Sequence, residues 1–228
     1  MTVSAETRQQ MQDLMAKYPD PRSALLPMLH LALADDGAVT PGGIETCAEL
    51  LDLTPAEVSA VATFYTMYKR QPIGKHHLGV CVNPGCGVLG GDEIWKAVSN
   101  ELGVDHDETT PDGMFTVERI ECQAACTHAP VMTVDWEFMD DMTPQSAREL
   151  IAKLRAGEEV KSTRGPVITD YRESERAVAG IDDGKGDVPA TDAKMLAGLT
   201  EAKQRGMSAP AMPATPPPPP APPAGKEG

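Results

Sequence analysis

The stretch HHLGVCVNPGCGVLGGDEIW, residues 76–95, decides the predicted fold of this chain. Its apolar first part predicts a strand that ends near Cys81. A turn with proline and glycine then brings Cys86 back toward Cys81. A helix is predicted from about Asp92 to Leu102, because apolar side chains recur there at helical spacing. Two cysteines in such a loop can serve as a metal site, as a redox dithiol, or as core residues of a tight turn.

More strands and a second helix are predicted downstream. MFTVERIE (114–121), PVMTVDW (130–136) and the short piece 137–139 have strand-like patterns. Thr143 with Pro144 begins the helix, and Gly157 is placed as its stop. A strand, crossover helix and strand should form a parallel pair, beside which a later strand returns antiparallel. The order strand, helix, strand, strand, helix predicts an α/β or α+β domain of thioredoxin-like type over residues 76–157.

Residues 1–75 are predicted to form a bundle of three or four helices. Capping residues followed by proline mark several helix starts, and Thr54, Pro55 and Glu57 form a capping box. The predicted helices run from about Glu6 to Lys17, from Pro21 to Gly37, from Thr40 to Leu51 and from Pro55 to about Tyr68. Cys47 lies alone in this bundle, and we expect a buried structural thiol there.

The last third of the chain loses this periodicity. Residues 158–180 keep Val167, Ile168, Tyr171 and a short potential helix, which predicts an extension that docks on another surface. Residues 181–228 are rich in proline and alanine and end in a polyproline tract. Such a composition buries too little apolar area to offset its ordering entropy, so a disordered tail is expected.

Composition limits the possible partners and the compartment. The 228 residues include 34 acidic and 20 basic side chains, which argues against nucleic acid or an anionic membrane surface. The N-terminus lacks a secretion signal, and the apolar stretch Leu25–Ala34 is about half the length of a membrane span. A cytoplasmic chain without a membrane span is therefore expected. Its five cysteines are better suited to metal or redox chemistry than to disulfides.

Four cysteines form two pairs. Cys81 and Cys86 have the spacing C-x4-C, and after 35 intervening residues Cys122 and Cys126 have the spacing C-x3-C. Each pair follows a strand of the proposed parallel pair, so both should meet at one edge of the sheet. Such spacings suit a two-iron, two-sulfur cluster in which each pair holds one iron, and structural zinc is the second choice. An exchange dithiol would need C-x-x-C, which this chain lacks.

The surroundings of these cysteines fit a cluster. Gly87, Gly90 and Gly91 leave backbone N–H groups open near a helix start, where an anionic cluster is favoured. Four cysteines complete two tetrahedral irons, so His128 is expected to contact solvent or a partner instead. Residues 76–157 carry 14 acidic and 5 basic side chains, which disfavours adding an electron and predicts a low reduction potential.

The chain contains no G-x-G-x-x-G after a strand, so no nucleotide-binding loop is expected on this polypeptide. A cluster without such a loop predicts a role in electron transfer. Two other classes stay open: a free-standing thioredoxin-like ferredoxin, against which the helical bundle argues, and a zinc-stabilised interaction module.

The sequence also resembles a known family. FYTMYKRQPIGKHHLGVCVNPGC (64–86), GGDEIW (90–95), ECQAAC (121–126) and the following Ala-Pro are similar to the small [2Fe-2S] subunit in the NADH dehydrogenase module of respiratory complex I, NADH-quinone oxidoreductase. The resemblance runs from about Tyr18 to Gly157. Relatives in NAD-reducing hydrogenases and NAD-dependent formate dehydrogenases share the module. CQAAC and CGVLGG differ from the family's more usual loops, which affects the expected potential and partner contacts more than ligation.

The resemblance implies one cluster held by Cys81, Cys86, Cys122 and Cys126 in a thioredoxin-like fold. It implies a flavoprotein partner that carries FMN and the NADH site, together with the large iron-sulfur subunit of the same complex. It further implies a peripheral arm on the cytoplasmic face of the plasma membrane. In that family the cluster is usually viewed as a side acceptor of flavin electrons. The enzymatic activity, NADH:quinone oxidoreduction, would then belong to the complex and not to this chain alone.

Overall fold

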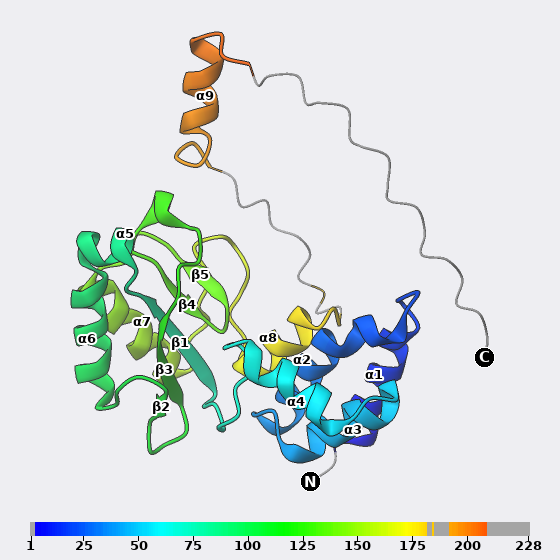
Figure 1. Ribbon diagram of the computed structural model, residues 1–228. Coiled ribbons are helices and arrows are strands. Elements are labelled where there is room, and N and C mark those ends of the chain that lie inside the picture. The colour runs from blue at the N-terminus through cyan, green and yellow to red at the C-terminus, as the bar shows by residue number, and fades with distance from the viewer. Residues whose placement is uncertain (1–2, 182–183, 185–191, 209–228) are drawn as a thin grey trace. The chain divides into compact units, whose positions relative to one another are not determined.

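A mixed β-sheet carries the two cysteine pairs in the computed structural model, which describes residues 3–181, 184 and 192–208 (Figure 1). Within these residues its strands are β1 (His76–Cys81), β2 (Glu108–Thr109), β3 (Phe115–Ile120), β4 (Met132–Val134) and β5 (Glu137–Met139), in the order β2-β3-β1-β4-β5. β1 and β3 are parallel and β4 is antiparallel to β1, as predicted. The sequence does not predict β2, because two residues are too few to show a period.

Two helices cover one face of this sheet. They are α6 (Asp92–Leu102), at the predicted bounds, and α7 (Pro144–Ala156), which Thr143 caps and Gly157 ends at φ +72° (Figure 1). Alternate residues of β1, Leu78 and Val80, point toward these helices and are fully buried. The fold predicted for residues 76–157 is therefore confirmed, because strands and helices share one apolar core.

The opposite face of the sheet is polar although it is also buried. His77 of β1 and Glu118 of β3 lie there, and their side chains are 2.8 Å apart. The Lys69 ammonium reaches the same carboxylate at 2.6 Å from the segment that joins the bundle to β1. Burial opposes ionisation of Glu118, but its bonds to His77 and Lys69 prevail and lower its pKa.

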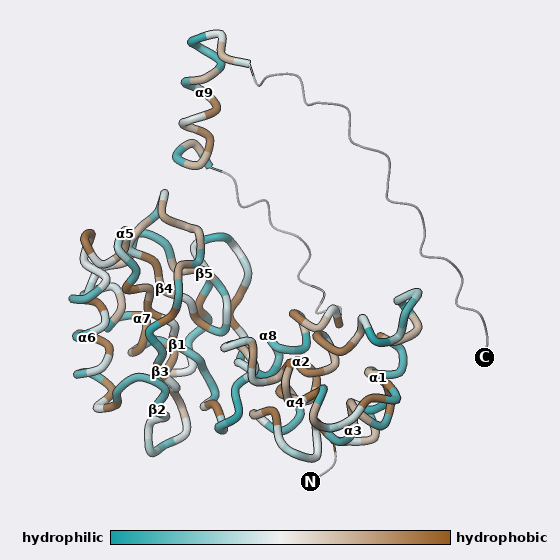
Figure 2. Tube along the Cα trace, viewed as in Figure 1, coloured by the Kyte–Doolittle hydropathy of each residue, from teal (hydrophilic) through white to brown (hydrophobic). Residues whose placement is uncertain are grey.

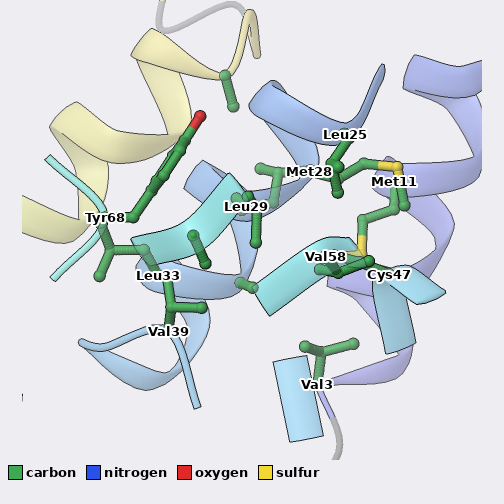
Figure 3. Close-up of a cluster of buried hydrophobic side chains, with 14 of the residues drawn as sticks. Val3, Met11, Leu25, Met28, Leu29, Leu33, Val39, Cys47, Val58 and Tyr68 are labelled. Carbon is green, nitrogen blue, oxygen red and sulfur yellow. The ribbon is translucent and has the colours of Figure 1, made fainter. Parts of the chain in front are cut away.

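The N-terminal helices form a bundle with its own core. They are α1 (Ala5–Met15), a 3₁₀ turn (Pro21–Ala24), α2 (Leu25–Asp36), α3 (Pro41–Leu51) and α4 (Pro55–Phe64). The predicted caps are present: the Thr40 hydroxyl accepts from the Gly43 N–H at 3.2 Å, and Thr54 with Glu57 forms the capping box. Figure 3 shows Met11, Met28, Cys47 and Val58 gathered between the helices, and Figure 2 shows α2 as a largely hydrophobic segment.

Helix α4 ends four residues before the predicted end at Tyr68. Tyr65 is extended, with φ −97° and ψ +128°, and the following residues fold back over the bundle. The hydroxyl of the buried Tyr68 donates a hydrogen bond to the Leu26 carbonyl at 3.1 Å. The Val39 N–H donates to the Lys69 carbonyl at 2.7 Å. These contacts hold residues 65–69 in a non-helical course across the bundle, and helix propensity alone does not show them.

The extension after α7 contacts both parts of the chain. It includes α8 (Tyr171–Val178), which packs against α2 of the bundle, while Ile168 joins the core of the sheet. The fully buried Glu175 carboxylate bonds to the His30 ring nitrogen on one side and accepts from the Trp136 indole N–H at 2.6 Å on the other. Glu175 therefore joins α2 to the turn between β4 and β5.

Residues Met1–Ala190 form one compact unit with separate cores for the bundle and the sheet. The boundaries predicted at residues 75, 157 and 180 stay predictions. In the second unit the structure has a helix, α9 (Ala197–Gln204), where none is expected, and Asp192 accepts from the Met195 N–H at 2.9 Å before it. The predicted disorder of the polyproline tract lies outside the described residues. Over the part of the chain that is described, every helix is too short or too polar to cross a bilayer.

Candidate metal centre

The two cysteine pairs leave the same edge of the sheet. β1 ends at Cys81, β3 ends at Ile120, and these two residues are partners in the parallel register. Cys86 follows Cys81 after one short loop, whereas Cys122 and Cys126 lie in the loop after Ile120. The carboxyl ends of parallel strands thus bring all four cysteines to one edge, as the spacing predicted.

The sulfur atoms are close enough to share a metal group. The Sγ atoms of Cys122 and Cys126 are 3.8 Å apart. Two thiolates on one tetrahedral ion, with metal–sulfur bonds of about 2.3 Å, would also lie about 3.8 Å apart. The thiol of Cys86 interacts with the thiols of Cys81 and Cys126, and the thiol of Cys126 also interacts with that of Cys81. The geometry of the second pair therefore fits a single metal atom, with the first pair beside it.

The two cysteine pairs suit a two-iron cluster. Each pair comes from its own loop at the end of its own strand. Structural zinc needs four ligands around one ion, whereas a two-iron cluster needs one cysteine pair for each iron, with sulfide between them. Two neighbouring cysteine pairs on separate loops match the second requirement.

The two pairs differ in exposure. Cys81 and Cys86 are 2% and 3% exposed, while Cys122 and Cys126 are exposed to solvent. Burial raises the pKa of Cys86 to about 11, and the neighbouring Cys122 thiol raises the pKa of Cys126. Thiols must become thiolates to bind a metal cation, so metal binding at this edge would release protons.

The first loop is closed by close backbone packing. Pro84–Cys86 form a single helical turn, α5, and the Gly87 N–H donates to the Asn83 carbonyl at 2.8 Å. Gly91 lies against the base of the loop, where a Cβ atom would be 2.5 Å from the Cys81 carbonyl oxygen. Gly90 has φ +115°, a conformation that favours glycine. The predicted glycines therefore shape the loop, in addition to leaving N–H groups open.

The second loop corrects one expectation. His128 does not contact solvent: it is 5% exposed, and its ring nitrogen lies 3.0 Å from the Asp141 carboxylate. A short turn, Cys126–His128, points the histidine inward, and a cis Ala129–Pro130 bond follows it. Ala124, between the two cysteines, has φ +55°. Glycine or asparagine at position 124 would have indicated a left-handed conformation in the sequence, but alanine does not.

Sequence reasoning also missed the polar face behind the first cysteine. His77 shares a face of β1 with Gly79 and Cys81, and Glu118 lies opposite on β3. The signal available in HHLGVC was the set of small or polar residues at alternate positions, His77, Gly79 and Cys81. Leu78 and Val80 between them made the whole strand look apolar.

Comparison with known proteins agrees with this geometry. The family described as thioredoxin-like [2Fe-2S] ferredoxin matches residues 11–155. This chain belongs to that family. The match covers the bundle from α1 and the sheet up to α7. The group that the family binds is one [2Fe-2S] cluster, which the paired thiols at the sheet edge fit.

Several relatives within this family have names. The E subunit of the Mycobacterium tuberculosis NADH-quinone oxidoreductase is 49% identical over 200 residues, covering 87% of this chain and 79% of its own. Subunit 2 of the Thermus thermophilus NADH-quinone oxidoreductase is 37% identical, covering 68% and 88%. The E subunit of the Rickettsia bellii NADH-quinone oxidoreductase is 39% identical, covering 63% and 88%.

One solved structure shows the same fold. An NAD⁺-reducing [NiFe]-hydrogenase in the air-oxidised state superimposes with a TM-score of 0.52 at 20% identity. The similarity covers 58% of this chain but 23% of the hydrogenase chain, so our chain spans about a quarter of that protein. At this identity the likeness shows the fold of the ferredoxin family alone.

Proposed function

We propose that this chain is the [2Fe-2S] electron-transfer subunit of an NADH-quinone oxidoreductase. The observation that carries the proposal is the meeting of two cysteine pairs at one sheet edge, in a chain 49% identical to the mycobacterial relative over 87% of its length. A bound [2Fe-2S] cluster accepts and returns one electron. The chain itself supplies the ligands, the loops that space them and the protein surface around them.

The ligands in this proposal are Cys81, Cys86, Cys122 and Cys126. The 3.8 Å sulfur separation in the second pair and the burial of the first pair support it. Cys47 is excluded because it lies in the core of the bundle, fully buried, where burial raises its pKa to about 12. The exposed second pair is the side from which an electron would enter or leave, since transfer is favoured by close approach.

The partner in this proposal is a flavoprotein subunit that binds FMN and NADH, with the large iron-sulfur subunit of the same complex nearby. Val88 and Leu89 support a docked partner, because they are 87% and 60% exposed and lie two and three residues after Cys86. Large apolar side chains at the rim of a redox site are stabilised when another protein covers them. The complex would place this chain in the peripheral arm at the cytoplasmic face of the membrane.

Other parent enzymes would use the same site. An NAD-reducing hydrogenase or an NAD-dependent formate dehydrogenase remains an alternative context, and the named relatives favour the quinone-linked one. A free-standing ferredoxin is disfavoured by the exposed residues Val88 and Leu89.

Cysteine variants test the ligand set. Serine at Cys81, Cys86, Cys122 or Cys126 should each lower the iron and acid-labile sulfide content of the purified chain. Cys47→Ser is the matched control and should keep both. Unchanged iron in Cys86→Ser would remove Cys86 from the ligand set. Lost iron in Cys47→Ser would contradict the exclusion of Cys47.

Complex formation tests the partner. The tagged full-length chain, expressed in its native host, should co-purify with an FMN-containing subunit, and NADH should reduce FMN in that preparation. Charged substitutions at Val88 and Leu89 should weaken the co-purification while the iron content stays unchanged. Purification of the cluster-containing chain without any flavoprotein would favour the free-standing carrier instead.

A further inference from the structure

Asn83 lies in the first ligand loop, and its side chain reaches toward the second. It follows Cys81 by two residues, is half-buried, and begins the helical turn α5. Its side-chain amide nitrogen donates to the Ile120 carbonyl at 3.1 Å, across 37 positions of sequence. Ile120 ends β3, two residues before Cys122. The bond therefore joins the loop of the first cysteine pair to the chain that enters the second.

The ordinary explanation for this asparagine does not apply. Asparagine before a helical turn usually accepts from an N–H of the first turn. Here the side chain makes no such cap bond. A carbonyl oxygen only accepts hydrogen bonds, so Ile120 needs the donor half of the carboxamide. The side chain of Asn83 is thus directed away from its own helix and toward the other loop.

The bond from Asn83 to Ile120 lies where strands β1 and β3 separate. The parallel ladder between β1 and β3 ends at the pair Cys81 and Ile120, and the two chains then diverge into their loops. The bond from Asn83 adds one more link beyond the last pair. The backbone carbonyl of the same residue accepts from Gly87 at 2.8 Å and closes the first loop. One residue therefore holds the first loop closed and ties it to the second.

We propose that Asn83 is a positioning residue for the four-cysteine site, because its carboxamide fixes the spacing between the first and the second cysteine pair. This inference rests on the proposed function, since it needs a cluster bound by both pairs. The pairs lie on separate loops, so the rigidity between them sets how evenly the two irons are held. Without the amide, the second loop can move relative to the first while each pair stays intact.

Two substitutions separate the hydrogen bond from other effects. Asn83→Ala removes the side chain beyond Cβ. Asn83→Asp keeps the shape but replaces the donor by a carboxylate, which cannot donate to a carbonyl. Asn100, the other asparagine of the chain, is exposed on α6, and Asn100→Ala is the matched control. The purified full-length chain is compared for iron content, for the rate at which a chelator bleaches the cluster, and for the EPR g values after dithionite reduction.

Both Asn83 variants should lose the cluster about two- to tenfold faster than the parent, the factor expected for one neutral hydrogen bond. Their EPR g values should shift, while Asn100→Ala matches the parent in both measurements. Unchanged loss rates and g values in Asn83→Ala would overturn the inference. Faster loss in Asn83→Asp alone would also overturn it, because added charge would then be the cause. A parent chain without iron and sulfide would refute the proposed function instead, so the two failures are distinguishable.

Discussion

Adding one methyl group at three glycines of the first cysteine loop should destabilise the protein in a graded order. Gly85, Gly87 and Gly91 lie in the same short segment, and a Cβ atom would meet its nearest neighbour at 3.9, 3.2 and 2.5 Å, respectively. None of the three has positive φ, so the substitutions add no backbone strain of that kind. The series therefore isolates steric overlap at the base of the candidate site.

The expected magnitudes follow from these distances. In Gly85→Ala the contact is ordinary, and the lower entropy of the unfolded chain should leave stability unchanged or raise it by up to about 1 kcal/mol. In Gly91→Ala the new atom would overlap the Cys81 carbonyl oxygen and lie 3.0 Å from the Cys86 backbone, neither of which can rotate away. Overpacking of this kind costs about 1–3 kcal/mol. Gly87→Ala, facing the Val82 carbonyl, should fall between them.

Thermal unfolding of the full-length chain and its iron content measure this series. A loss of about 2 kcal/mol corresponds to a melting temperature roughly 4–8 °C lower for a chain of this size. Gly91→Ala should also retain less iron than the parent, because the displaced carbonyl belongs to a proposed ligand. Equal melting temperatures and iron contents for Gly85→Ala and Gly91→Ala would refute the packing described for this loop.

Two further substitutions and one labelling experiment test other parts of the structure. Glu175→Ala should lower the free energy of unfolding by about 3 kcal/mol, because it leaves buried polar partners on α2 and β4–β5 unpaired, whereas exposed Glu173→Ala should have little effect in the same urea titration. Glu118 has a lowered pKa, so its bond to His77 contributes stability above about pH 4.5 that is lost as the pH falls further; a Glu118→Gln variant should show a flatter stability curve between pH 6 and 3. The thiol of Cys47 should resist iodoacetamide in the native protein and react after unfolding, and rapid native labelling would contradict its burial.

Local signals in the sequence were enough to predict most elements of the sheet domain. Thr143, Pro144 and Gly157 define α7 by capping chemistry, and the apolar period defines α6. Both signals lie within the element that they specify. The early end of α4 at Phe64 could not be predicted in this way, because contacts of Tyr68 with α2, far away in sequence, determine it.

The candidate site, too, has some features that local sequence signals predict and others that contacts distant in sequence determine. Parallel strands bring the carboxyl ends of β1 and β3 together, so the meeting of the cysteine pairs followed from their spacing and the predicted topology. The bond from Asn83 to Ile120 depends on the register of those strands, which no local pattern encodes. The inward position of His128 likewise depends on Asp141, thirteen residues away. Sequence therefore predicted which residues meet, and the structure adds how their loops are held.

The most direct test of the central claim is EPR spin quantitation on the purified, dithionite-reduced chain, with iron and sulfide measured on the same sample. If Cys81, Cys86, Cys122 and Cys126 hold one [2Fe-2S] cluster, the sample should contain about two irons and two sulfides per chain and give a spin-half signal that approaches one spin. One zinc per chain without any spin-half signal would contradict the account.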